Sequence, residues 1–226
     1  MKKQNLINIL CSLICVVFGC NRTPDSYYPL KEGMTWEYQV SGRSMFGAGA
    51  AATIVMTNLA HRELKGQTVT PQKVDANAQT YFSFIAADSS GICEFAKQSP
   101  EAVEPELKIP PVYMIKYPIA VGTRWQSKTE TSLLMSKVPI TLASTIESVD
   151  EIITVPAGTF NKCIKIKSVG STKKSLGIFG TVKVSVESYS WYTLGVGVIK
   201  SALKETSNNL MVGAGEATIQ LKSFKK

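Results

Sequence analysis

Short runs in which hydrophobic and polar residues alternate recur along the sequence after residue 28. In 34–40 every second residue is Met, Trp, Tyr or Val, and 181–187 and 217–222 follow the same pattern. A period of two is typical of a β-strand with one buried face. Glycine and proline turns separate the runs, and no helical period continues over four turns. The sequence therefore predicts an all-β sandwich or barrel.

Alternation predicts further strands, which are joined by turns near Lys65-Gly66 and at 156–158. These strands are expected at 53–57, 68–74, 81–84, 92–97, 140–149, 152–155, 160–167, 189–192 and 198–203. Residues 98–116 contain four prolines, and a proline cannot donate a backbone hydrogen bond. We therefore expect 98–116 to be a connector that crosses the surface.

A nine-residue motif with Tyr, Pro, Gly and Trp at identical spacing occurs twice, at 28–36 and at 117–125. An aromatic strand, a glycine turn and a second strand follow each motif in the same order. We infer two related β-meanders, 28–97 and 117–205, in which the tryptophan that ends each motif occupies an equivalent core position. The alternative is that strands opened by proline and glycine simply resemble one another.

The first twenty residues have the plan of a secretory signal. Lys2 and Lys3 precede an apolar run, Leu6–Phe18, which ends at Gly19-Cys20. Gly19-Cys20 resembles the lipobox of bacterial lipoproteins, in which the chain is cut before the cysteine and the cysteine is acylated. The resemblance implies that residues 1–19 are removed and that Cys20 carries lipid. The alternatives are ordinary secretion and a membrane span, although a span needs about 20 mostly apolar residues.

Residues 20–27 would then be the lipidated cysteine and a short polar tether, followed by a single domain, 28–226. The seven residues after Cys20 reach at most about 25 Å when fully extended, so the domain must lie close to its membrane. By resemblance to enteric lipoproteins, Asn21 in place of an aspartate indicates the outer membrane. We expect a protein of the cell envelope that is attached to the membrane through Cys20.

The charge balance is basic, with 25 Lys and Arg residues against 17 Asp and Glu residues. Without Lys2 and Lys3 the balance is 23 against 17, which gives the mature chain a net charge of +6. In an exported protein this charge favours anionic lipids or acidic polymers over nucleic acid. Because the lysines are scattered, we interpret the charge as one that serves solubility, and we expect no nucleic-acid partner.

Two cysteines, Cys93 and Cys163, remain after the signal and the lipidation site are set aside. An exported compartment permits a disulfide between them. Two buried thiols that behave as small hydrophobic residues are the alternative. Alternation in 160–167 places Cys163 on the same side as Lys165 and Lys167, where a lone thiol is unusual.

Three turn-and-strand motifs, Tyr28–Tyr38, Val155–Cys163 and Trp191–Gly197, resemble those of a group of uncharacterised bacterial lipoproteins, which can be called TapB-like. The resemblance covers about residues 28–200. It implies a strongly curved antiparallel sheet, or a partly open barrel, with few or no helices after the signal peptide. These motifs specify architecture and carry no chemistry of their own.

Residues suited to catalysis are few. His61 is the only histidine, it lies beside a hairpin turn, and no second ligand follows at metal spacing. Acidic residues group at 101–106 and at Asp150-Glu151, in segments where carboxylates are usually solvated. Neither a GxSxG elbow nor a phosphate-binding glycine loop occurs. We expect a protein that is not an enzyme and that needs no metal or cofactor.

Four apolar stretches, most of them flanked by glycine, are the less ordinary feature. If exposed together, they would form an apolar rim suited to a lipid, an acyl chain or an envelope protein. The residues that would make this contact are Met45, Phe46, Ile178, Phe179, Leu210 and Met211, with 133–135 as the fourth stretch. The alternative is that they are ordinary hairpin tips. We therefore expect a binding or structural envelope lipoprotein, or else a carrier or chaperone for an apolar ligand in a cavity under the curved sheet.

Overall fold

The computed structural model describes residues 26–44, 47–48, 52–76, 79–131, 138–175, 177, 180–209 and 212–226. The first half of the fold contains β1 (Thr35–Ser44), β2 (Gly47–Ala48), β3 (Ala52–Asn58), β4 (Arg62–Leu64), β5 (Gln67–Ala76), β6 (Gln79–Asp88), β7 (Gly91–Gln98) and β8 (Glu106–Lys116). The second half contains β9 (Arg124–Thr131), β10 (Val138–Val155), β11 (Gly158–Ser175), β12 (Thr181–Thr193), β13 (Gly197–Ser207) and β14 (Ala214–Lys225). Within these residues no helix has the length and apolar character needed to cross a membrane.

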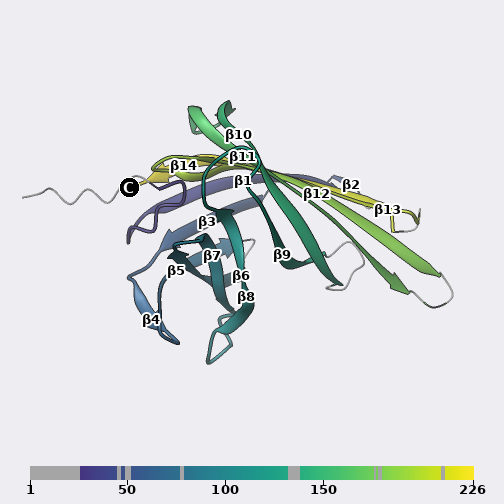
Figure 1. The fold of residues 1–226 in the computed structure, drawn as a ribbon, viewed down its shortest axis with the longest axis horizontal. Coiled ribbons are helices and arrows are strands. Elements are labelled where there is room, and N and C mark those ends of the chain that lie inside the picture. The colour runs from purple at the N-terminus through teal and green to yellow at the C-terminus, as the bar shows by residue number, and fades with distance from the viewer. Residues whose placement is uncertain are drawn as a thin grey trace, which may run out of the picture.

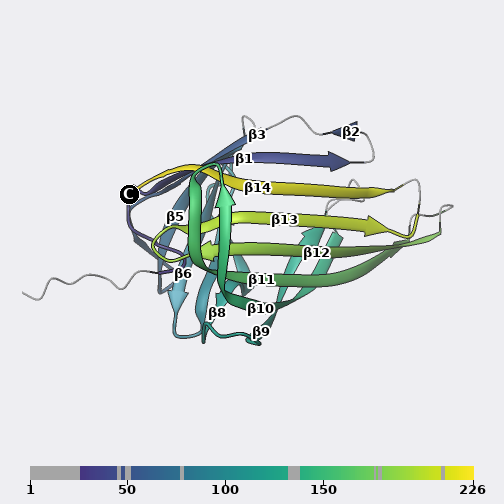
Figure 2. The same ribbon diagram turned by 90° about the horizontal axis from the view of Figure 1, so that it is seen from above.

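The strands form one strongly curved antiparallel sheet (Figures 1 and 2), which confirms the predicted fold class. Its order is β8-β7-β6-β5-β3-β1-β14-β13-β12-β11-β10-β9, with β2 paired to β1 and β4 paired to β5. The two edges approach each other, because Tyr113 O of β8 accepts hydrogen bonds from Trp125 Nε1 at 3.0 Å and from Ser127 Oγ at 3.2 Å on β9. The sheet is therefore nearly closed into a barrel.

The strand order consists of two meanders of six consecutive strands, β1-β3-β5-β6-β7-β8 and β9 to β14, joined where β1 pairs with β14. Trp36 lies on the first strand of one meander and Trp125 on the first strand of the other, and both are buried. Each indole N–H donates to a backbone carbonyl, Trp36 to Val196 O at 2.6 Å and Trp125 to Tyr113 O. Each tryptophan thus lies on the first strand of its meander, while their equivalence and a common origin of the two halves stay predictions.

Strand β8 corrects the expectation that 98–116 is only a connector. Residues 106–116 pair with β7 although Pro110 and Pro111 lie among them. The pairing skips from Leu107, opposite Ala96, to Val112, opposite Glu94, so the prolines lie in an irregular stretch of the strand. Because β8 is also an edge strand, its missing N–H groups cost no hydrogen bond with a second neighbour.

Buried hydrophobic side chains of the sheet gather in separate clusters. One core cluster contains Tyr28, Ile85, Ile115, Ile146 and Ile164, so it joins the N-terminal segment to both meanders. A second cluster packs Val138 and Ile140 of β10 against Val182, Val184 and Val186 of β12. Buried hydrophobic side chains thus form a core at the end where the N-terminal segment enters and a separate cluster along β10 and β12.

Candidate functional site: an apolar cavity at one end of the sheet

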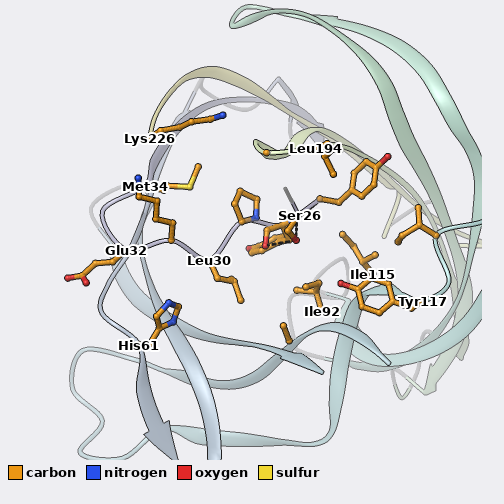
Figure 3. Close-up of a pocket in the computed structure, with 17 residues that line it drawn as sticks. Ser26, Leu30, Glu32, Met34, His61, Ile92, Ile115, Tyr117, Leu194 and Lys226 are labelled. Atoms are coloured by element: carbon orange, nitrogen blue, oxygen red, sulfur yellow. Dashed lines mark hydrogen bonds between the residues drawn. The ribbon is translucent and has the colours of Figure 1, made fainter. Parts of the chain in front are cut away.

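A cavity of about 890 Å³ lies at the end of the sheet where β1 begins (Figure 3). Its walls come from the N-terminal segment, from the ends of β6, β7 and β8, and from the turn between β12 and β13. Hydrophobic side chains such as Leu30, Ile92, Ile115 and Ile119 form much of the lining. The volume falls within the range of about 300–1,000 Å³ that is typical of ligand sites.

The N-terminal segment is held across this end by a chain of buried hydrogen bonds. Tyr28 Oη donates to Gln72 Oε1 at 2.9 Å, and Gln72 Nε2 donates to Asn58 Oδ1 at 3.0 Å. Asn58 Nδ2 then donates to the carbonyl oxygens of Pro29 and Lys31, both at 3.1 Å. Because Tyr28, Gln72 and Asn58 are all buried, these bonds fix the course of the segment beside the cavity.

Tyr28 of the N-terminal segment packs its ring against that of Tyr192 at the end of β12. The rings of Tyr28 and Tyr192 have centroids 6.5 Å apart and are tilted by 47°. Burial raises the pKa of Tyr192 to about 12 and also raises the pKa of Tyr28, whose neighbour Tyr192 adds to the effect. Both phenols therefore remain neutral at ordinary pH and act as packing and hydrogen-bonding groups.

The charged side chains of the lining, and its histidine, lie at the rim of the cavity. Lys31, Glu32, His61 and Lys226 line it and are all exposed. Figure 3 shows His61 and Glu32 on one side of the opening and Tyr117 on the other. His61 Nδ1 lies 2.7 Å from Thr70 Oγ1, and the described residues contain no group of three His, Cys, Asp or Glu that could hold a metal. The site is thus an apolar hollow with a sparse polar rim.

The family model described as DUF3108-like matches residues 31–214, which is most of the chain. The chain belongs to the DUF3108-like family. This assignment confirms the resemblance to an uncharacterised family that the turn-and-strand motifs carry. No curated protein matches the sequence significantly.

Two solved structures resemble this DUF3108-like chain. One, from Parabacteroides distasonis, is provisionally described as a lipoprotein; it is 14% identical, has a TM-score of 0.42, and the match covers 89% of this chain and 99% of that one. The other, from Bacteroides fragilis, is provisionally described as an exported protein with a YmcC-like fold; it is 12% identical, has a TM-score of 0.44, and the match covers 89% and 100%.

Most of the residues singled out from the sequence lie outside the described residues. This holds for Cys20 and for all six expected apolar contacts, Met45, Phe46, Ile178, Phe179, Leu210 and Met211. The carboxylates of 101–106 and 150–151 do not line the cavity. Glu151 instead accepts a hydrogen bond from Trp191 Nε1 at 2.9 Å, which gives it a structural role. His61 is the one residue considered for catalysis that reaches the site.

The disulfide considered between Cys93 and Cys163 is not formed, and both are free, buried thiols. Cys93 packs with Val69 and Phe84, while Cys163 packs with Trp36 and Val155 in a different cluster. Cys163 is buried because the end of the β10–β11 hairpin curls over it, where the strand register shifts three times. Burial raises the pKa of Cys93 to about 11 and also raises that of Cys163.

The sequence analysis considered a cavity under the curved sheet, but it did not anticipate the place and the lining of this cavity. Its lining combines residues 26–34 with loops that are far apart in the chain, so no local pattern marks it. Two signals were present. Tyr27–Leu30 is an apolar stretch that precedes the first strand, and Leu194 is a hydrophobic residue placed in a glycine turn.

Proposed function

We propose that the protein is a membrane-anchored lipoprotein of the cell envelope, without catalytic activity, whose end cavity binds an apolar ligand. The observation that supports this most directly is the cavity of about 890 Å³ with hydrophobic walls. It opens at the end of the sheet from which the chain leads back to Cys20, since Ser26 and Tyr27 are part of its lining. An acyl chain has the shape and chemistry for such a hollow.

The non-catalytic role is supported by the arrangement of the polar groups at the rim. His61 Nδ1 is engaged with the Thr70 hydroxyl at 2.7 Å, and a hydroxyl is not the carboxylate that orients a catalytic histidine in a triad. Glu32, the carboxylate in the lining, is exposed to solvent.

A role as carrier or chaperone for an apolar ligand is the second candidate. The end cavity of about 890 Å³ is the site that we propose for this role. What favours it is that the cavity is open at the rim and is not enclosed by the core. A ligand held there could be released without unfolding of the sheet.

Anchoring is tested by labelling cells with radioactive palmitate. The wild-type protein should incorporate the label and lose residues 1–19, whereas Cys20→Ala should accumulate as an unlabelled precursor. The signal sequence and Gly19-Cys20 are the reasons for this expectation. Equal labelling of the two proteins would rule out Cys20 as the lipidated residue, and outer-membrane localisation is then read from fractionation of the labelled protein.

Ligand binding is tested with a dye that fluoresces in apolar surroundings and is displaced by palmitate. Ala87 is an exposed residue of β6 that lines the cavity, so Ala87→Trp should fill part of the hollow and weaken dye binding about tenfold. Ala143→Trp is the matched control, because Ala143 is an exposed strand residue of β10 that does not line the cavity. Equal dye binding by both variants, or none by the folded wild type, would refute a ligand site in this cavity.

A further inference from the structure

Three large hydrophobic side chains are exposed on the loops around the cavity mouth. Tyr117 is 42% exposed and Val121 is 63% exposed in the loop between β8 and β9, and Leu194 is 49% exposed in the turn between β12 and β13. Tyr117 and Leu194 also line the cavity (Figure 3). Single exposed hydrophobic residues are common, but a group of them beside an apolar opening calls for a binding partner.

The loops that carry these side chains are held in place by hydrogen bonds. In the β8–β9 loop Tyr117 N donates to Ser90 O at 2.9 Å, and Gly122 N donates to Ile146 O at 2.9 Å. Thr123 Oγ1 closes the loop by donating to Pro118 O at 2.8 Å. Tyr117 and Val121 are therefore presented to solvent by a loop whose backbone is fixed at three points.

The turn that carries Leu194 is bonded directly to the start of the tether. Gly195 N donates to Ser26 O at 2.9 Å, so the chain leaves the domain beside Leu194. Only residues 21–25 separate Ser26 from Cys20. Six residue steps of about 3.3–3.6 Å each give a maximum reach of about 20 Å. A lipid on Cys20 thus keeps the cavity mouth within about 20 Å of the bilayer.

We infer that Tyr117, Val121 and Leu194 insert into the surface of the bilayer that holds the anchor, so that the cavity mouth faces the membrane. This inference rests on the anchoring through Cys20 proposed above. Tyrosine and aliphatic side chains suit the interface, where one end of a ring can stay hydrated while the rest is apolar. An apolar ligand could then pass between the bilayer and the cavity without crossing water.

The insertion depends on apolar contact more than on charge. The ionisable rim residues are Lys31 and Lys226 on the positive side and Glu32 on the negative side, with His61 beside them. Such a small excess of positive charge gives little attraction at physiological salt, where the Debye length is about 8 Å. Binding should therefore change little when salt is raised or when anionic lipid replaces neutral lipid.

The orientation is tested with the lipidated protein in vesicles that contain brominated phospholipid, which quenches nearby tryptophan. Val121→Trp places a probe at the mouth. Val103→Trp places a second probe in the loop between β7 and β8, at the opposite end of β8 from Val121. Val103 is 93% exposed. We expect the fluorescence that Val121→Trp adds to that of the native tryptophans to be strongly quenched. The fluorescence that Val103→Trp adds should stay unquenched. Equal quenching of the two probes would overturn the inference.

A second measurement uses the unlipidated chain from Asn21, which contains every residue of the described core. Tyr117→Ser/Leu194→Ser should bind vesicles about tenfold more weakly than wild type, a difference of about 1.4 kcal/mol. Val103→Ser/Ile109→Ser, which removes two other exposed hydrophobic residues, should bind like wild type. Equal binding by both double variants would contradict the inference.

The possible failures can be told apart. If Cys20 carries no label and the protein stays out of the membrane fraction, the anchoring proposal fails. If the protein is lipidated and membrane-bound but the Val121→Trp probe stays unquenched and solvent-exposed, only the docking inference fails. A probe whose emission shifts to the blue without quenching by brominated lipid would mean that a protein partner covers the mouth, which also overturns docking on the bilayer.

Discussion

The buried hydrogen bond between Tyr28 and Gln72 should make the Tyr28→Phe variant measurably less stable. The Tyr28 hydroxyl donates to Gln72 Oε1 at 2.9 Å, and both side chains are buried, at 7% and 2% exposure. Removing the hydroxyl leaves the shape of the ring unchanged but leaves Gln72 Oε1 without this donor. A buried polar atom that loses its partner costs about 1–3 kcal/mol, so the free energy of unfolding should fall by about that amount.

Urea unfolding followed by tryptophan fluorescence measures this change. The matched control is Tyr113→Phe, which also removes one hydrogen bond, from Tyr113 Oη to Asp88 Oδ2 at 2.6 Å. That bond is exposed to water, which can replace the lost partner, so the control should cost about 0.5 kcal/mol or less. The m-value should stay the same in both variants, because neither changes the surface exposed on unfolding.

A result in which Tyr28→Phe costs no more than Tyr113→Phe would refute this reasoning. It would mean that water reaches Gln72 Oε1 from the cavity and replaces the phenol. The series of hydrogen bonds from Tyr28 through Gln72 to Asn58 would then not be needed to hold residues 29–31 across the end of the sheet.

Two further predictions concern the core. Trp36→Ala and Trp125→Ala should each lower the free energy of unfolding by about 3–5 kcal/mol, as expected for a buried aromatic residue, and a loss below about 1 kcal/mol in urea unfolding would contradict their placement in the core. Stability should also fall as the pH rises from 10 to 12. The pKa of Tyr192 is raised from 10 to about 12 by burial, so the folded state keeps a proton that the unfolded state has lost. The stabilisation is complete below pH 10 and declines by about 2–3 kcal/mol up to pH 12, and Tyr192→Phe should reduce this pH dependence in alkaline unfolding measurements.

The sheet was predictable because its local signals agree with one another. Alternation identifies β1 and β12, and the Lys65-Gly66 turn between β4 and β5 is visible as a glycine after a lysine. Both turn residues have positive φ, 51° and 80°, which a tight hairpin turn requires. Strand β8 could not be predicted in this way, because its prolines are tolerated by an irregular stretch of pairing and by its place at the edge of the sheet.

The site was less predictable because it depends on contacts between distant parts of the chain. Asn58 and Gln72 are polar residues that face inward, against the rule that polar positions of an alternating strand face solvent. They are buried because the N-terminal segment supplies their partners, and that segment has no periodic pattern. Likewise, alternation placed Cys163 on the side of Lys165 and Lys167, where a lone thiol is unusual. Its burial follows from the curl of the β10–β11 hairpin, which the sequence pattern does not reveal.

The position of the cavity follows from how the N-terminal segment enters the sheet. To reach β1, the chain must cross the open end between the β12–β13 turn, bonded through Gly195, and the Asn58 side chain of β3. Tyr28 turns into the core, while Leu30 and the ends of β7 and β8 line the space that the described side chains leave open. The segment that forms one wall of the cavity is therefore also the segment that continues to Cys20. In the proposed lipoprotein, a ligand in the cavity would touch residues 26–32 directly, so the segment in contact with the ligand would also be the one that leads to the anchor.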